Sequence, residues 1–306
     1  MRVFVAGGTG VVGRRLVPQL VARGHHVIAT TTGLDKLVAL QRLGAEAVVM
    51  DGLDAASVRQ AVAAARPEAI VHQMTAISGK ADMKHMDRWF ATTNRLRTEG
   101  TDHLLAAAEA AGVSNFVAQS YAGWNGIRRG GWVKTEDEPL DLWEGTVAHP
   151  VMAAVRHTEE VVGKAGGAAL RFGWLYGPGA TESLVEPVRK RQFPIVGSGA
   201  GHTSWVHVDD AASATVLAVE QKATGVFNIV DDEPAPVSEW LPYLAECAGA
   251  KPPMRLPTWL ARPLAGNAVV GLMTEGRGFS NAKAKRELGW ALRYPTWRLG
   301  FKDELA

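Results

Sequence analysis

The sequence contains one cysteine, Cys247, in 306 residues. A single thiol excludes an internal disulfide and a cysteine-based zinc site, and it is typical of proteins in a reducing compartment. No apolar run reaches the roughly 20 residues that a membrane-spanning helix needs, and the first residues read as a strand without a charged leader or cleavage site. We therefore expect a cytoplasmic protein without a membrane segment.

The sequence also lacks an excess of either charge, because 33 Lys and Arg face 31 Asp and Glu. Without a long basic run, binding to nucleic acid or to an anionic membrane is not expected. No His, Asp or Glu spacing suggests a metal site. What is present, 47% hydrophobic and 21% charged residues, is typical of a globular protein. These features favour a small-molecule substrate.

Short apolar segments alternate with amphipathic ones through the first two-thirds of the chain, which predicts a parallel sheet covered by helices. The predicted strands cover residues 3–6, 26–30, 47–50, 69–72, 115–119 and 168–172. Predicted helices cover residues 10–23, 35–43, 86–111 and 151–164, with one more starting at residue 55. Residues 123–150 break the periodicity and are too long for a plain connection, so we interpret them as a functional loop.

The elements shorten after residue 179, and proline and glycine become more frequent. We therefore predict an α/β protein with a Rossmann-type doubly wound parallel sheet in residues 1–179. Residues 180–306 are predicted to form a small C-terminal α/β substrate lobe, from which some segments could return to the main sheet.

A glycine-rich turn joins the first predicted strand to the first predicted helix. Its glycines permit a tight turn, and the free amides and positive helix dipole at the helix start suit a pyrophosphate. The strand, helix and second strand that this motif requires are all in place. The predicted pyrophosphate-binding residues of the turn are Gly7, Thr9, Gly10, Val11, Val12 and Gly13.

The Gly-x-x-Gly-x-x-Gly spacing of this turn resembles the extended short-chain dehydrogenase/reductase family, which includes the NAD-dependent epimerases and dehydratases. Further matches follow in order at residues 71–76 (VHQMTA), 170–179 (LRFGWLYGPG), 205–210 (WVHVDD), 227–229 (FNI) and 287–290 (ELGW). The resemblance implies a nicotinamide cofactor and a homodimer formed through residues 86–111 and 151–164. It also implies that the cofactor is contacted by Asp51, Gly52, Met74, Thr75 and Ala76.

The end of the second strand bears on the choice between the two nicotinamide cofactors. An acidic residue there would bind the ribose of NAD and repel the extra phosphate of NADP, but the sequence has Thr30, Thr31 and Thr32. The hydroxyls of Thr31 and Thr32, with Lys36 one helical turn on, could accept a phosphate. We predict a preference for NADP(H), with NAD(H) as the alternative.

The catalytic positions depart from the family. Its members use a Ser or Thr hydroxyl after the fifth strand and a Tyr-x-x-x-Lys pair on the next helix, where the lysine lowers the pKa of the tyrosine. Here the hydroxyl position falls on Tyr121, preceded by Ser120, and the next helix has no Tyr-x-x-x-Lys pair. One register places Met152 and Arg156 at the missing pair, whereas a one-residue slip places Val151 and Val155 there.

Two interpretations follow. In the first, Tyr121 replaces the missing acid, Ser120 orients the substrate, and Arg156 holds the nicotinamide ribose or favours the phenolate, because an arginine cannot itself donate the proton. His149, at the start of the helix, is a further candidate for proton relay. In the second, Tyr121 is a pocket wall, and the protein binds the cofactor without the usual redox step.

Ten tryptophans point to an aromatic pocket. The predicted substrate-pocket residues are Trp124, Met152, Trp174 and Tyr176. An aromatic wall favours an apolar substrate over a sugar nucleotide, whose diphosphate would call for clustered arginines. The second possibility stays open through Arg128, Arg129, Arg189 and Arg191.

The function that the sequence favours is NAD(P)H-dependent reduction of a carbonyl, or oxidation of an alcohol, on an apolar and aromatic small molecule. The alternatives are an epimerase or dehydratase that acts on a sugar nucleotide, and a non-catalytic regulator that senses NADP.

Overall fold

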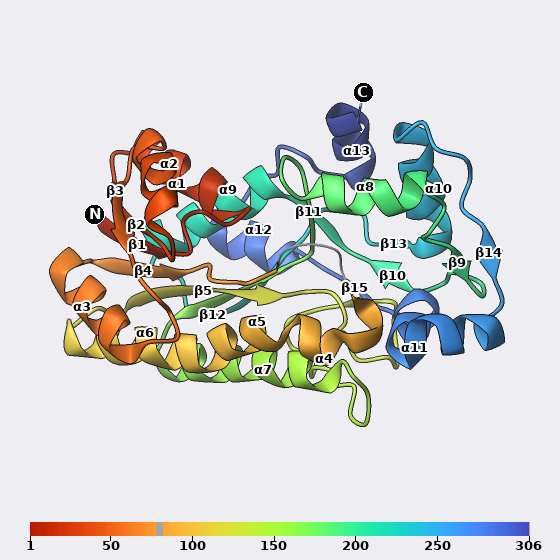
Figure 1. The fold of residues 1–306 in the computed structure, drawn as a ribbon, viewed down its shortest axis with the longest axis horizontal. Coiled ribbons are helices and arrows are strands. Elements are labelled where there is room, and N and C mark those ends of the chain that lie inside the picture. Colours follow the sequence, from red (N-terminus) through yellow and green to blue (C-terminus); the bar gives the residue numbers. More distant parts are fainter. Residues whose placement is uncertain (78–81, 306) are drawn as a thin grey trace.

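The computed structural model describes residues 1–77 and 82–305, and a seven-stranded parallel sheet lies at its centre (Figure 1). The strand order is β12-β7-β5-β4-β1-β2-β3. The strands are β1 (Arg2–Ala6), β2 (His26–Thr31), β3 (Glu46–Val49), β4 (Ala69–His72), β5 (Asn115–Tyr121), β7 (Ala168–Phe172) and β12 (Gly225–Ile229). The doubly wound α/β prediction and its six strands are confirmed. The order reverses at β1, and ligands of such sheets bind at this switch point, beyond the carboxyl ends of the strands.

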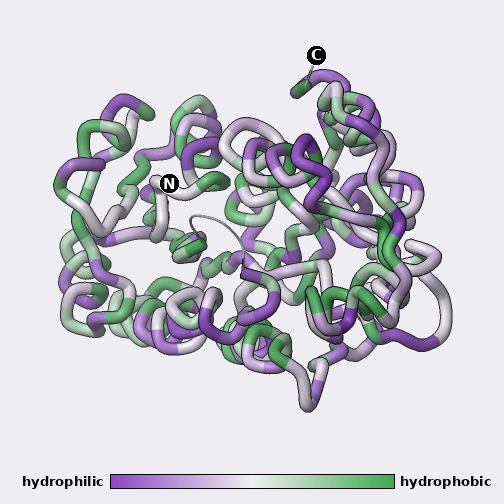
Figure 2. Tube along the Cα trace, turned by 45° about the vertical axis from the view of Figure 1, so that its right-hand side comes forward, coloured by the Kyte–Doolittle hydropathy of each residue, from purple (hydrophilic) through white to green (hydrophobic). Residues whose placement is uncertain are grey.

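Helices cover both faces of the sheet because its strands alternate between two apolar cores. Val3 and Val5 face one core, while Phe4 and Ala6 face the other. The first face carries α1 (Gly13–Ala22), α2 (Leu37–Arg42), α9 (Val208–Glu220) and α12 (Ala282–Leu288). The second carries α3 (Ala55–Ala65), α6 (Thr101–Ala110) and α7 (His149–Lys164). Hydrophilic and hydrophobic positions alternate along these helices, as expected for helices with one buried side (Figure 2).

The predicted helix over residues 86–111 is interrupted. After η2 (Met83–His85), it consists of α4 (Met86–Trp89), α5 (Ala91–Arg95), a π-helical turn η3 (Leu96–Gly100) and α6. The backbone of Phe90 leaves the helical region between α4 and α5. Gly100 fits close to the Gly52 carbonyl, where an added Cβ would lie 3.4 Å from that oxygen. Wide turns of this kind often occur at functional sites.

The C-terminal part is built of short elements around tryptophans. Its helices are α8 (Thr181–Arg189), α10 (Val237–Cys247), α11 (Thr258–Glu275) and α13 (Trp297–Leu305). Its strands are β8 (Trp174–Tyr176), β9 (Ile195–Val196), β10 (His202–Thr203), β11 (Trp205–His207), β13 (Ala235–Pro236), β14 (Arg255–Leu256) and β15 (Gly278–Phe279), and β15 pairs with β6 (Val133–Lys134). Because β12, α9 and α12 belong to the main sheet and its cover, the chain after residue 179 contributes to both parts.

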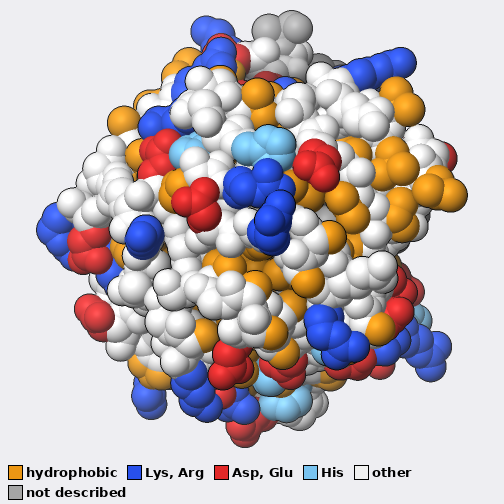
Figure 3. Space-filling model, turned by 90° about the vertical axis from the view of Figure 1, so that its left-hand side faces the viewer, with side chains coloured by type: hydrophobic (Ala, Val, Ile, Leu, Met, Phe, Trp, Pro, Cys, Tyr) orange, Lys and Arg blue, Asp and Glu red, His pale blue; other side chains and the backbone are white. Residues whose placement is uncertain are grey.

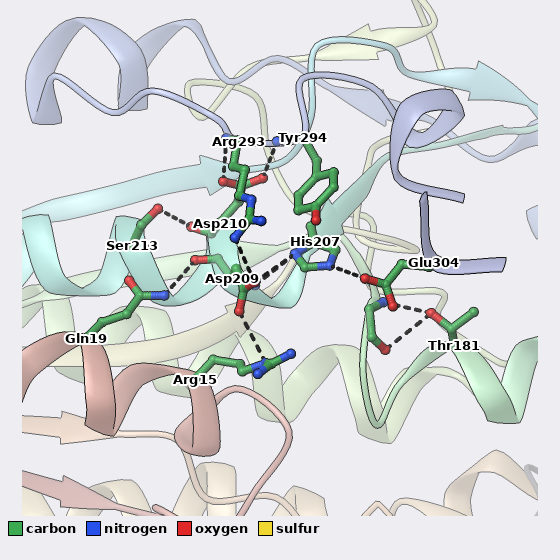
Figure 4. A network of polar contacts seen from close by, with 11 residues as sticks. Arg15, Gln19, Thr181, His207, Asp209, Asp210, Ser213, Arg293, Tyr294 and Glu304 are labelled. Carbon is green, nitrogen blue, oxygen red and sulfur yellow. Dashed lines mark hydrogen bonds and ion pairs between the residues drawn. The ribbon is translucent and has the colours of Figure 1, made fainter. Parts of the chain in front are cut away.

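A polar network joins the C-terminal segment to helices α9 and α1 (Figure 4). The buried Asp210 carboxylate accepts hydrogen bonds from the backbone amides of Arg293 at 2.7 Å and Tyr294 at 2.9 Å. Its neighbour Asp209 forms an ion pair with Arg15 of α1 at 3.2 Å. These contacts fix the C-terminal segment beside the glycine-rich turn.

The surface agrees with the mixed charge of the sequence. On the face in Figure 3, acidic and basic side chains are interspersed and form no broad field of one sign. Within residues 1–77 and 82–305, no helix combines the length and the hydropathy required to cross a bilayer.

Candidate active site

The backbone of the glycine-rich turn packs so tightly that a side chain is excluded at Gly7 and at Gly13. Gly7 has a φ of 94°, and a Cβ on Gly13 would lie 2.5 Å from the Gly7 carbonyl oxygen. The Gly7 amide donates a hydrogen bond to the Thr30 hydroxyl at 3.1 Å, which ties the turn to β2. The close approach of Gly13 brings the start of α1 onto the end of β1.

Backbone donors at this turn are free to bind a ligand. The amides of Val11 and Val12 have no acceptor among the residues that the structure describes. They lie at the amino end of α1, where the helix dipole is positive. The free amides and the positive end of the helix dipole fit the pyrophosphate of a dinucleotide.

The predicted residues for the adenosine end lie around the ends of β2 and β3. Thr31 is buried and accepts from the Gly33 amide, whereas Thr32 and Lys36 are exposed. Sequence reasoning missed Asp35, whose carboxylate folds over Gly33 so closely that a Cβ there would lie 2.2 Å from Asp35 Oδ1. A carboxylate and an ammonium group therefore both lie near this end of the site.

The other predicted cofactor residues follow β3 and β4. Asp51 is exposed and accepts from the Leu53 amide at 2.9 Å, and Gly52 contacts the side chain of Met74. Thr75 and Ala76 are exposed just beyond β4. Since β3 and β4 end at the same edge of the sheet as β1, these positions lie at the edge where ligands of such sheets bind.

Ser120 does not take its predicted catalytic place. Its hydroxyl donates to Glu159 Oε1 at 2.6 Å, and Arg171 holds the same carboxylate through two hydrogen bonds of 2.8 and 2.7 Å. All three side chains are buried. Ser120 is directed at Glu159 of α7, whereas Tyr121, at the end of β5, packs against the apolar cluster that contains Met152. Ser120 therefore belongs to a structural network.

Arg156 also differs from its predicted role. It lies on the exposed side of α7, 3.6 Å from Glu160, while Val151, Met152 and Val155 are buried. The one-residue slip weighed above is therefore the better register, because it places the buried Val151 and Val155 at the two positions, whereas the other register places the exposed Arg156 at one of them. One residue along a helix rotates a side chain by about 100°, which is enough to turn Arg156 to the solvent.

Tyr121 lies among apolar and cationic groups. Its ring meets Trp124 edge to face, with 5.9 Å between centroids, and covers Gly123, where a Cβ would lie 2.2 Å from the hydroxyl oxygen. Burial of the hydroxyl raises the pKa of Tyr121 well above its ordinary value, and the charge of Arg97 and the indole of Trp174 oppose this shift only in part. The phenol is therefore neutral and can donate a hydrogen bond.

Sequence reasoning missed Arg97, the charged group that acts on Tyr121. It lies in η3 with its side chain buried, and burial lowers its pKa to about 10. A signal was present, because Thr93, Arg97 and Thr101 follow one another at helical spacing along a buried stripe. An arginine in such a buried stripe is unusual, because arginine is almost never fully buried unless it is paired.

A buried apolar cluster packs against Tyr121. It contains the predicted pocket residues Trp124 and Met152, with Trp174 packed against it. Its other members are Met86, Phe90, Trp143, Ala148, Val151, Val155, Ala268 and Leu272. Residues of α4, α7, α11 and the loop after β5 thus meet at one place.

Two other predicted residues lie elsewhere. Tyr176 is fully buried in the C-terminal core, edge to face with Trp205 and Phe301, because Gly300 of α13 lies directly on its ring. Tyr176 is therefore a core residue and not a pocket wall. His149 is bound through Nδ1 to the Leu142 carbonyl at 3.0 Å, which anchors the loop before α7.

Comparison with known proteins shows the family to which the chain belongs. The sequence profile of the NAD dependent epimerase/dehydratase family matches residues 3–230. The chain belongs to this family. The predicted recognition is thus confirmed, as is a nicotinamide cofactor at the level of the family.

Among curated relatives, the 3-diazoavenalumate denitrifying reductase of a Streptomyces species is 43% identical and covers 99% of this chain and 100% of its own. A 4-hydroxy-2-methyl-3-oxo-4-farnesyl-3,4-dihydroquinoline-1-oxide ketoreductase of Stigmatella aurantiaca is 27% identical, with coverage of 96% and 92%. The reductase names of these relatives confirm the prediction of an oxidoreductase.

Among solved structures, UDP-glucose 4-epimerase of Thermotoga maritima has a TM-score of 0.78 at 23% identity, with coverage of 100% and 97%. The human epimerase family protein SDR39U1 with NADPH has a TM-score of 0.73 at 20% identity, with coverage of 100% and 97%. These likenesses concern the fold.

Proposed function

We propose that this protein is a nicotinamide-dependent reductase of an aromatic small molecule whose reducible group accepts hydride without needing a proton. The observation that carries this proposal is the replacement of the usual tyrosine and lysine by the buried Val151 and Val155. The relative at 43% identity, whose name specifies a diazo substrate and a denitrifying reduction, supports the same chemistry.

Reduced nicotinamide held at the glycine-rich turn would supply a hydride to an arenediazonium ion; the C–N bond of the substrate would be replaced by a C–H bond, N₂ would leave, and the nicotinamide would be oxidised. Charge and atoms balance in this reaction without a proton. Reduction of a carbonyl, by contrast, requires a proton for the oxygen. A site without an acid pair therefore suits the diazo group.

The residues of this chain then bind and orient. The amides of Val11 and Val12 hold the pyrophosphate at the amino end of α1. Trp124 offers the aromatic surface on which a substrate ring would pack, and the buried Met152 supports it from behind. Tyr121 stays neutral and donates a hydrogen bond to the substrate.

We propose NADP(H) as the preferred cofactor. The exposed Lys36 and the hydroxyls of Thr31 and Thr32 support it, whereas Asp35 disfavours a phosphate nearby. The Lys36 variant described in the Discussion tests the balance between these charges.

The second candidate is carbonyl reduction, with Tyr121 as the proton donor. Its support is the neutral phenol beside Arg97 and the ketoreductase relative at 27% identity. A sugar nucleotide has less support, because Arg128 packs on Trp143 and pairs with Asp141, and Arg189 binds the Ala248 carbonyl. These arginines do not form a diphosphate site.

The deciding experiment compares wild type and Tyr121→Phe with NADPH, using benzenediazonium and acetophenone as substrates and reactions without enzyme as blanks. The proposal expects NADPH oxidation with N₂ release from benzenediazonium, and a loss of at most about 10-fold in Tyr121→Phe, the size of one lost hydrogen bond. Oxidation with acetophenone alone, lost about 100-fold or more in Tyr121→Phe, would establish the second candidate. Tight NADPH binding without turnover of either substrate would favour the NADP-sensing regulator.

We also propose a homodimer through α6 and α7, which lie side by side on one face of the sheet (Figure 1). Light scattering coupled to size-exclusion chromatography tests it, and a monomer at all concentrations would contradict it.

A further inference from the structure

Arg97 is a buried cation without a counterion. It is only 7% exposed, and its Nη1 has no hydrogen-bond partner. No carboxylate in the described part of the chain forms an ion pair with it. With a pKa of about 10, the guanidinium remains charged at neutral pH. Burying an uncompensated charge is costly, so this arrangement calls for a ligand that supplies the opposite charge.

The other buried basic residues show that the fold ordinarily provides partners. Among the described residues, Arg171 is held by Glu159, Lys134 by Glu138, and Arg277 donates to a backbone carbonyl. Only Arg97 of these four lacks a protein oxygen as a partner for its side chain. Arg97 also lies close enough to Tyr121 to act on its hydroxyl, at the place where we expect the substrate to bind.

The groups around Arg97 are donors as well. Nε1 of Trp124 is buried without a partner, and the indole of Trp174 is directed at the Tyr121 hydroxyl. Trp124 packs on the Tyr121 ring, and both Trp174 and Arg97 act on the Tyr121 hydroxyl. Unfilled donors without acceptors form a site complementary to an anion, since charge-assisted hydrogen bonds are the stronger kind.

The cofactor does not supply this anion. Its pyrophosphate belongs to the glycine-rich turn after β1, whereas Tyr121 ends β5, with β4 between the two strands. The nicotinamide and its ribose carry no negative group. The anion must therefore come from the substrate.

We propose that Arg97, Tyr121 and Trp174 bind an oxyanion of the aromatic substrate, a carboxylate or a phenolate. This inference rests on the proposed function for the aromatic nature of the substrate. It adds a specificity-determining residue, Arg97, and predicts that neutral aromatic compounds are poor ligands.

The test measures binding by calorimetry to the protein saturated with NADP⁺, so that it does not depend on turnover. Two pairs of probes are used: cinnamate with methyl cinnamate, and 4-nitrophenol near neutral pH with 4-nitroanisole. Wild type is expected to bind at least one anion about 10- to 100-fold more tightly than its neutral counterpart. Preference for cinnamate identifies a carboxylate site. Preference for 4-nitrophenol, with the visible absorption of the phenolate in the complex, identifies a phenolate site.

Variants assign the preference to Arg97. Arg97→Met, which keeps the volume and removes the charge, is expected to abolish the preference, and Arg97→Lys to retain part of it. Arg88→Met, at an exposed arginine of α4, is the matched control and should leave the preference unchanged. Unliganded Arg97→Met should unfold at a temperature no lower than wild type, because a merely structural arginine would stabilise the fold.

Three results would overturn the inference. The first is equal affinity of wild type for the charged and neutral probes, and the second is an unchanged preference in Arg97→Met. The third is a loss of NADP⁺ affinity in Arg97→Met that equals its loss of probe affinity. If Arg97→Met does not fold, Arg97→Lys decides: an unchanged anion affinity with weakened NADP⁺ binding counts against the inference, and reduced anion affinity with normal NADP⁺ binding supports it.

Discussion

Glu159→Gln removes the negative charge from the buried ion pair between α7 and β7. In the folded protein the carboxylate receives two hydrogen bonds from Arg171 and one from Ser120, and the side chains of Glu159 and Arg171 are only 7% and 5% exposed. The variant leaves the guanidinium buried without a charge partner. Breaking such a pair costs about 3–5 kcal/mol, so we expect the free energy of unfolding to fall by this amount.

The chain offers a control of the same geometry at the surface. Glu99 receives two hydrogen bonds of 2.8 Å each from Arg95, but these side chains are 45% and 56% exposed. Glu99→Gln should cost less than about 1 kcal/mol, because water screens the exposed pair.

Urea denaturation of both variants measures the difference, and the dependence on denaturant concentration should stay that of wild type. A loss below about 1 kcal/mol in Glu159→Gln, or equal losses in the two variants, would refute the argument from burial. Since Ser120 serves the same carboxylate, Ser120→Ala should cost about 1 kcal/mol of stability and leave the turnover rate unchanged. If a stable Ser120→Ala variant turned over substrate about 100-fold more slowly than wild type, Ser120 would have a catalytic role after all.

Three further predictions concern the cofactor and pH. Gly13→Ala should weaken NADPH binding at least about 10-fold in a fluorescence titration, because its Cβ would lie 2.5 Å from the Gly7 carbonyl oxygen; normal affinity would show that the turn can widen. Lys36→Met should reduce the ratio of NADPH to NADH affinity by about 10-fold, and a constant ratio would remove Lys36 from phosphate recognition. Burial lowers the pKa of His72 from 6.5 to about 4, so its imidazole is neutral in the folded protein, and the stability present above pH 6.5 is lost as the pH falls toward 4, by about 3 kcal/mol. Nuclear magnetic resonance of the ring protons should show no titration of His72 near pH 6.5, and a midpoint there would contradict this account.

The sheet and the cofactor turn are specified by local sequence. Short apolar runs such as β1 and β4 are buried on both faces, and the spacing from Gly7 to Gly13 has a local physical meaning, since no side chain fits the close approach. The absence of the tyrosine and lysine pair was also visible without a structure. These features depend on neighbours in the chain, and the residues themselves specify them.

Which side chains meet is a property of the tertiary structure. Rotation by one position on α7 separates the exposed Arg156 from the buried Val155; the apolar spacing of α7 indicates its buried side, but what that side meets is decided by packing on the sheet. Likewise, Ser120 pairs with a carboxylate 39 residues away, and the π-helical turn η3 brings Arg97 to Tyr121 from another element. The chemistry of the site thus depends on contacts between distant segments, because the packing of helices on the sheet sets the direction in which each side chain points.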